Sequence, residues 1–138
     1  MPAFQLRVST LIALVLLVTA TACGSPGSSG GSSLTQEQVA QIATDALTAL
    51  NTGDYTAYTQ HFSGMMKGAV PEATFKELRD QLASVAGKFV SIEKVEKLPA
   101  QTQGYIRWIF TVNFEKTQGK FTLVIPEDGA QIEGVHFE

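Results

Sequence analysis

The chain is short of cysteine and histidine, the residues from which disulfides and most metal sites are built. Its 138 residues include one cysteine, Cys23, so neither an intrachain disulfide nor a thiolate metal cluster can form. The two histidines, His61 and His136, lie far apart in the sequence, and His61 has no carboxylate at helical spacing. The sequence therefore predicts no metal site and no cofactor.

An excess of basic residues is also missing. Ten Lys and Arg stand against thirteen Asp and Glu, which gives a net charge of -3, and the bases form no cluster. Proteins that bind nucleic acid bring several Lys or Arg together on one face, where they meet the phosphate backbone. We therefore expect no nucleic acid as a partner. The sequence also lacks a catalytic triad, a metal-ligand set and a phosphate-binding loop.

The main apolar run, near the start of the chain, is too short to cross a membrane. Arg7 precedes the apolar residues Leu11 to Val18, and small residues follow as far as Ala22. A spanning helix needs roughly 20 apolar residues. A basic start, a short apolar middle and a small-residue exit are typical of a secretory signal peptide.

The end of this segment, Ala20-Thr21-Ala22-Cys23, resembles the lipobox of bacterial lipoproteins. In such proteins the cysteine is lipidated and becomes the first residue of the mature chain. The resemblance implies that a lipid on Cys23 holds the protein at the cell membrane, on the extracytoplasmic side. The alternative is a plain signal peptide with a cysteine nearby.

The residues after Cys23 contain only Gly, Ser and Pro as far as Ser33, which is typical of a flexible tether. We therefore expect three regions. They are a lipoprotein signal peptide over residues 1–22, a lipidated cysteine with a Gly/Ser-rich tether over residues 23–33, and a single α+β domain over residues 34–138.

The clearest structural pattern runs from Tyr105 to Glu115. Its even positions are large and apolar, and its odd positions include Arg107, Ile109 and Thr111. Alternation with period two predicts a long strand with one buried face. Such a face must be covered by another layer, and the amphipathic segments upstream are suited to cover it.

Three helices are predicted before this strand. The first begins at a capping box of Thr35 and Gln38 and ends near Gly53. Asp54 caps a short second helix, and a loop from Met65 to Val70 separates it from the third. The third helix follows from Pro71 to Gly87, and the remaining strands are expected at residues 88–98, 120–125 and 130–137, with a bulge near Gly134.

The resulting α+β layer pair resembles the cone of the nuclear transport factor two-like, or cystatin-like, fold. It also resembles a bacterial extracytoplasmic family, domain of unknown function 3887, over about Val39 to Phe137. The residues that carry this resemblance are Gly53-Asp54-Tyr55, Phe62, Met66-Lys67, Gly87-Lys88-Phe89, Phe114-Glu115, Asp128-Gly129, Ile132, Gly134 and Phe137. The cone implies three helices on the concave face of a curved four-stranded antiparallel sheet. It also implies a homodimer through the outer face of that sheet, at Arg107, Ile109 and Thr111.

Candidate pocket residues lie where the helices are expected to meet the sheet: Tyr55, Tyr58, His61, Phe62, Trp108 and Phe110. Ligand sites are concave and largely apolar, with few polar groups, but the same aromatic residues are equally suited to an ordinary core. The sequence favours a non-catalytic module that binds a small apolar ligand or an envelope protein. The alternative is a small enzyme that uses His61 and Asp54 as acid and base.

Overall fold

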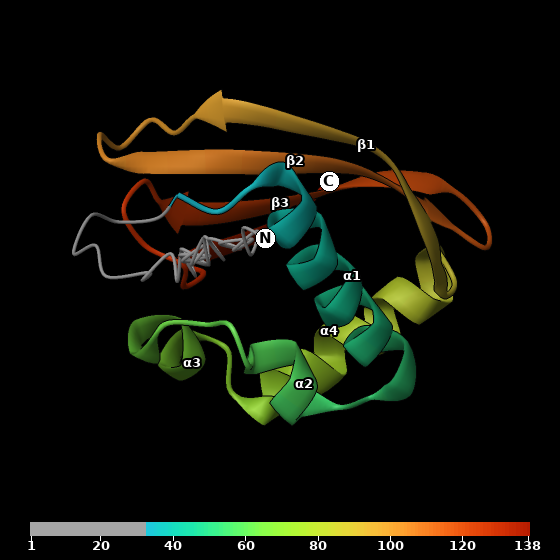
Figure 1. Cartoon of the computed structure of the whole chain (residues 1–138). Coiled ribbons are helices and arrows are strands. Elements are labelled where there is room, and N and C mark those ends of the chain that lie inside the picture. The colour runs from blue at the N-terminus through green and yellow to red at the C-terminus, as the bar shows by residue number, and fades with distance from the viewer. Residues whose placement is uncertain (1–32) are drawn as a thin grey trace, which may run out of the picture.

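The computed structural model describes residues 33–138, in which four helices precede four strands (Figure 1). The helices are α1 Gln36–Thr52, α2 Tyr55–Thr59, α3 Gly64–Ala69 and α4 Glu72–Val85. The strands are β1 Phe89–Pro99, β2 Tyr105–Phe114, β3 Gln118–Pro126 and β4 Gly134–Phe137. The predicted α+β class is confirmed. The predicted signal peptide, the predicted lipidation site Cys23 and all of the predicted tether except Ser33 lie outside the described residues.

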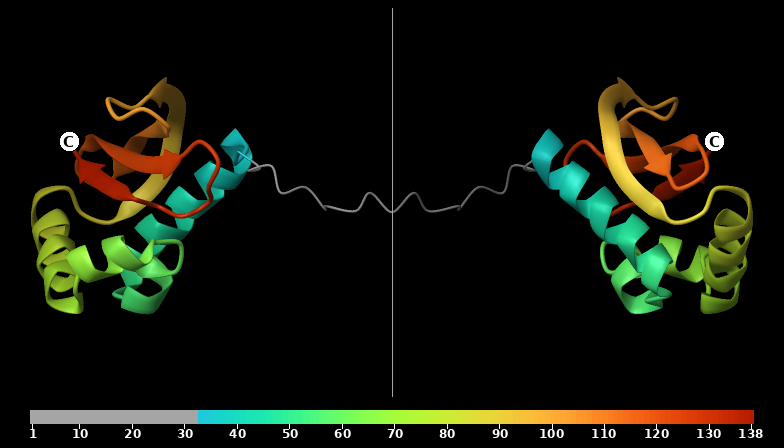
Figure 2. Two further views of the ribbon diagram at one scale, coloured as in Figure 1. Left: turned by 90° about the vertical axis from the view of Figure 1, so that its left-hand side faces the viewer. Right: turned by 90° about the vertical axis from the view of Figure 1, so that its right-hand side faces the viewer.

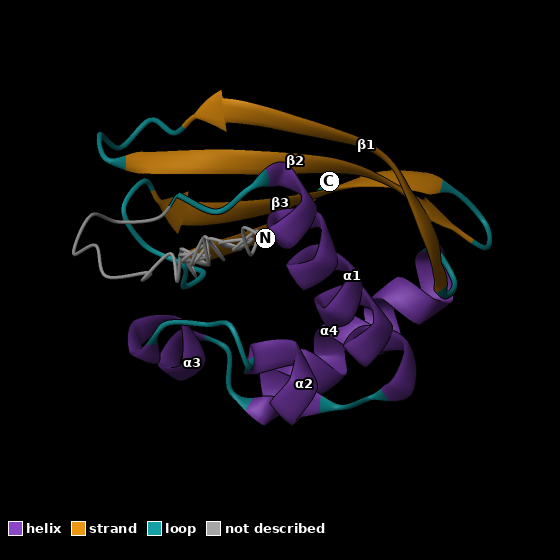
Figure 3. Cartoon of the chain, in the orientation of Figure 1, coloured by secondary structure: helices purple, strands orange, loops and turns teal. Residues whose placement is uncertain are grey.

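The molecule has two layers, with the strands forming one and the helices the other (Figure 3). The sheet is an antiparallel meander in the order β1-β2-β3-β4. Figure 2 shows α1 running obliquely across the strands. Among residues 33–138, no helix is long and apolar enough to span a bilayer.

Helix α1 has the ends that its sequence predicts. The Thr35 hydroxyl accepts a hydrogen bond from the Gln38 amide, and the Gln38 side chain accepts one from the Thr35 amide. Gly53 ends the helix with a φ of 75°, a left-handed conformation that glycine adopts without steric cost. The apolar stripe between these ends is buried, with Val39 and Leu47 fully inaccessible to solvent.

The period-two prediction for β2 is also confirmed. Trp108, Phe110 and Val112 are at most 3% exposed and face the helices. Their neighbours on β3 include Leu123, opposite Trp108, and Phe121, opposite Phe110, both fully buried. These side chains form the centre of the core. Arg107, Ile109 and Thr111 share the opposite face of the sheet.

Strand β1 does not follow period two. Phe89, Ile92 and Val95 pack against the core at spacings of three, because the pairing with β2 shifts register twice between them. Such shifts insert an extra residue and bend the strand. Figure 1 shows β1 curving from the end of α4 past α1 to the top of the sheet.

The prediction for the last strand was too long. Strand β4 begins at Gly134 rather than at residue 130, and Ile132 instead forms an isolated bridge with Phe62. The Glu133 amide donates to the carbonyl of Val124, which is also the register partner of Gly134. Glu133 and Gly134 thus both lie opposite Val124, which is the two-against-one pairing of a β-bulge, as predicted near Gly134.

The number of helices was also predicted wrongly, because residues 65–70 were expected to form a loop. They lie largely in α3, whose first turn is capped by the Ser63 hydroxyl at 3.1 Å from the Met66 amide. Gly64 and Gly68 lower the helix propensity of this segment, which hid the helix in the sequence. Ser63 is buried and held by Glu133, so tertiary contacts fix the cap.

Candidate functional site

Four of the predicted pocket aromatics lie in a closed core. Phe62, Trp108 and Phe110 are at most 3% exposed, and so is Tyr58. The Tyr58 ring lies 5.1 Å from Phe62 and 5.0 Å from Phe75 between centroids. Tyr58 alone among the six predicted residues also lines one of the hollows described below. Burial raises the pKa of the Tyr58 hydroxyl above its ordinary value of 10, so this group stays protonated at neutral pH.

Helix α4 buries one aromatic side chain in the core. Phe75 is the only residue of α4 that is fully buried, and its ring lies 5.6 Å from that of Tyr55. Leu78 and Leu82 are half-buried, whereas Val85 is 70% exposed. The apolar stripe of α4 is thus only partly covered.

The uncovered part of this stripe faces β4 across a groove of about 440 Å³, which we call the α4–β4 groove. Its apolar lining comes from α3, α4, β4 and the residue after α3: Met66, Val70, Leu78, Leu82, Val85, Val135 and Phe137. Tyr58, Thr74, Gln81 and His136 supply its polar groups. A largely apolar concavity with a few polar groups has the character of a small-molecule site.

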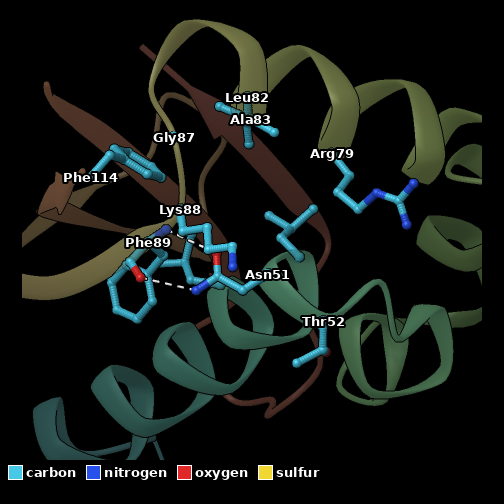
Figure 4. Close-up of a pocket in the computed structure, with 11 residues that line it drawn as sticks. Asn51, Thr52, Arg79, Leu82, Ala83, Gly87, Lys88, Phe89 and Phe114 are labelled. Atoms are coloured by element: carbon cyan, nitrogen blue, oxygen red, sulfur yellow. Dashed lines mark hydrogen bonds between the residues drawn. The ribbon is translucent and has the colours of Figure 1, made fainter. Parts of the chain in front are cut away.

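A second hollow, of about 200 Å³, lies between α1, α4 and the start of β1 (Figure 4). We call it the basic hollow, because Arg79 and Lys88 are its only charged lining residues. Its apolar lining consists of Leu47, Leu50, Leu82, Ala83, Phe89 and Phe114. Leu82 is the one residue that lines both the basic hollow and the α4–β4 groove.

The side chain of Asn51 ties α1 to β1 at the edge of this hollow. Its amide nitrogen donates to the Phe89 carbonyl at 2.9 Å, and its amide oxygen accepts from the Phe89 N–H at 2.8 Å (Figure 4). One side chain thus satisfies both backbone groups of Phe89, as a neighbouring strand would. The sequence predicts only that the helix ends near Gly53, and no local pattern indicates this role of Asn51.

Comparison with protein families identifies the domain. Residues 43–134, more than half of the chain, match the family described as "Protein of unknown function (DUF3887)". The chain belongs to the DUF3887 family. Comparison with curated proteins and with solved structures gives no match.

Several residues that carried the resemblance to DUF3887 lie together at the basic hollow. Gly87, Lys88, Phe89 and Phe114 line it. Gly87 has a φ of 80°, and a Cβ added there would lie 2.9 Å from the Cβ of Glu115. A side chain at this position is therefore opposed both by the backbone conformation and by lack of space.

The His61 and Asp54 pair of the DUF3887 domain stays a prediction. The Asp54 carboxylate accepts from the Ala57 amide at 3.0 Å and so caps α2. His61 is half-buried, and its backbone carbonyl accepts from the Ile132 amide at 2.8 Å. Among residues 33–138, no three His, Cys, Asp or Glu residues gather in a way that could hold a metal ion.

Proposed function

We propose that this DUF3887 protein is a non-catalytic binding module, held on the extracytoplasmic side of the cell membrane by a lipid on Cys23. In this proposal the α4–β4 groove holds a small apolar ligand. The observation that carries it is the groove itself, whose volume of about 440 Å³ lies within the 300–1,000 Å³ typical of ligand pockets.

The partial exposure of α4 supports the groove over the aromatic core as the ligand site. An apolar side chain that stays in water forgoes about 25 cal/mol per Å² of surface that burial would gain. Val85, 70% exposed at one end of the groove, and the half-buried Leu78 and Leu82 leave such surface uncovered. A bound apolar molecule covers it without any change in the closed core around Phe110.

Filling the groove with Thr74→Trp should displace the ligand. Thr74 is exposed and lines the groove, so an indole there takes up space without disturbing buried residues. We expect native mass spectrometry of the parent chain, purified gently from cell extract, to show a copurifying small molecule. Its retention should fall at least tenfold, about 1.4 kcal/mol, in the variant.

The matched control is Glu77→Trp, which adds the same bulky side chain to an exposed position of α4 outside the groove. This control should keep the ligand. A parent chain that carries no small molecule, or a Thr74→Trp variant that retains it, contradicts the proposal.

The anchor is tested by Cys23→Ser. Each buried CH₂ of a lipid chain contributes about 0.8 kcal/mol to membrane binding, so loss of the whole lipid should move the protein from the membrane fraction to the soluble fraction. Cell fractionation followed by immunoblotting measures this, with Ser25→Ala as the control that should stay with the membrane. If Cys23→Ser also stayed there, the anchor assignment would be wrong.

A further inference from the structure

We infer that the basic hollow and the α4–β4 groove together bind a single-chain anionic amphiphile, with its carboxylate at Lys88 and its hydrocarbon tail in the groove. The inference rests on the proposed function and names the class of its ligand. It adds an anionic head group and a passage for the tail beside Leu82.

The charge of the basic hollow points to an anionic head group. None of its lining residues is acidic, although acidic residues outnumber basic ones in the chain. Lys88 forms no ion pair with any residue in the described part of the chain. The nearby Glu115 carboxylate accepts the Lys88 backbone N–H at 2.9 Å instead. An anion in the hollow therefore meets an ammonium group that has no ion-pair partner.

The second cation stands at the rim of the same hollow. Arg79 pairs at 2.9 Å with Asp80, whose side chain is 70% exposed, and surface pairs of this kind contribute only about 0–1 kcal/mol. Figure 4 shows Lys88 extending beside Asn51, with Arg79 reaching out from α4. At about 200 Å³, the hollow suits a small head group such as a carboxylate.

The arrangement of α4 provides the path for a tail. Leu82 is half-buried and lines both hollows, so its side chain separates them. Leu78 and Val85, one turn before and one turn after it on the helix, line the groove side. Leu82 packs against the core on one side and borders a hollow on the other two, so a change of its rotamer would join the two hollows. The tail then runs from the charged hollow into the apolar groove.

Isothermal titration calorimetry with decanoate and decanol tests the head group. The full chain is used with Cys23→Ser, so that no attached lipid competes, and both probes stay below the concentration at which they self-associate. We expect decanoate to bind about tenfold more tightly than decanol. Decanoate should also bind about tenfold more tightly than octanoate, since each buried CH₂ contributes about 0.8 kcal/mol.

Lys88→Met should remove the preference for the charged head group. Lys88 is exposed, so the fold tolerates the change, and binding of decanol should not alter. The matched control is Lys76→Met on α4, where the lysine pairs with Glu72 outside both hollows. This control should keep the tenfold preference for decanoate.

Leu82→Trp tests the passage, because a larger side chain at the junction keeps the tail out of the groove. The gain in affinity from octanoate to decanoate should disappear in this variant. An undiminished gain in affinity would overturn the proposed passage.

The titrations separate this inference from the proposed function. If decanoate and decanol bind equally and Lys88→Met changes neither, the amphiphile is overturned while an apolar ligand in the groove stands. If neither probe binds, the amphiphile is overturned, and the mass spectrometry of the parent chain and of Thr74→Trp decides the proposed function separately.

Discussion

Replacing Phe75 with alanine should lower the free energy of unfolding by about 3–5 kcal/mol, the usual cost of removing a buried phenylalanine. Phe75 is 1% exposed, and its ring packs against Tyr55 and Tyr58. No other residue of α4 is fully buried, so the loss should fall unevenly. We expect α4 to open more often than α1, whose buried stripe is intact.

Urea denaturation measures the total loss, and hydrogen exchange locates it. The amides of α4 should lose protection first, by more than those of β2. Val85→Ala is the matched control, because Val85 lies on the same helix but is 70% exposed, and it should change stability by less than about 0.5 kcal/mol. Uniform loss of protection across the domain would show that α4 is not held separately.

Replacing Asn51 with leucine should cost about 2–4 kcal/mol. The change leaves the N–H and the carbonyl of Phe89 without their partners, and each unsatisfied group costs about 1–3 kcal/mol when buried. Phe89 is only half-buried, so the sum falls below the upper limit. Thermal or urea unfolding measures the loss.

Two further variants, one at Asn113 and one at Asn51, sharpen this prediction. Asn113→Leu, at an asparagine whose bonds are to exposed side chains, should change stability by at most about 0.5 kcal/mol. Asn51→Asp keeps the acceptor but sets a carboxylate against the Phe89 carbonyl. Only the protonated carboxyl donates to that carbonyl, so the folded state raises its pKa. The loss of stability of the Asn51→Asp variant relative to the parent should therefore shrink below pH 4 and grow as the pH rises. A deficit independent of pH would argue against the two-bond clamp.

The local features of this chain were predictable because they depend on neighbouring residues. Thr35 and Gln38 are three positions apart and satisfy each other's backbone groups in any helix that starts there. The alternation around Trp108 defines a strand face whatever lies beside it. The same holds for Gly53, because a left-handed residue ends a helix locally.

Features that depend on distant partners were missed. Helix α3 relies on Ser63, which Glu133 holds from 70 residues away, and its two glycines gave the opposite indication. Strand β1 directs Ile92 and Val95 inward only because its register against β2 shifts. Neither partner can be identified from the residues of the segment itself.

The candidate site was the hardest part to predict. Aromatic residues at helical spacing, such as Tyr55, Tyr58 and Phe62, suit a core and a pocket lining equally well. Whether there is a pocket depends on how closely α4 approaches β4, and this distance cannot be predicted from a local sequence pattern. The available signal was the apolar stripe through Leu78, Leu82 and Val85, which extends further than the core needs.

The order of the elements along the chain has a consequence for how the protein folds. Within residues 33–138 the four helices precede the four strands, so this part of the chain presents its helices first as it emerges from the ribosome. The Asn51 side chain can form its hydrogen bond only after Phe89 has been synthesised. The Ser63 side chain can form its bond only after Glu133, near the C-terminal end of the sequence, has been synthesised. Contacts between distant segments slow folding, and the buried face of α1 stays exposed meanwhile. The nascent chain is therefore prone to aggregate until β3 and β4 have emerged, and chaperones that bind apolar helices would protect it during that interval.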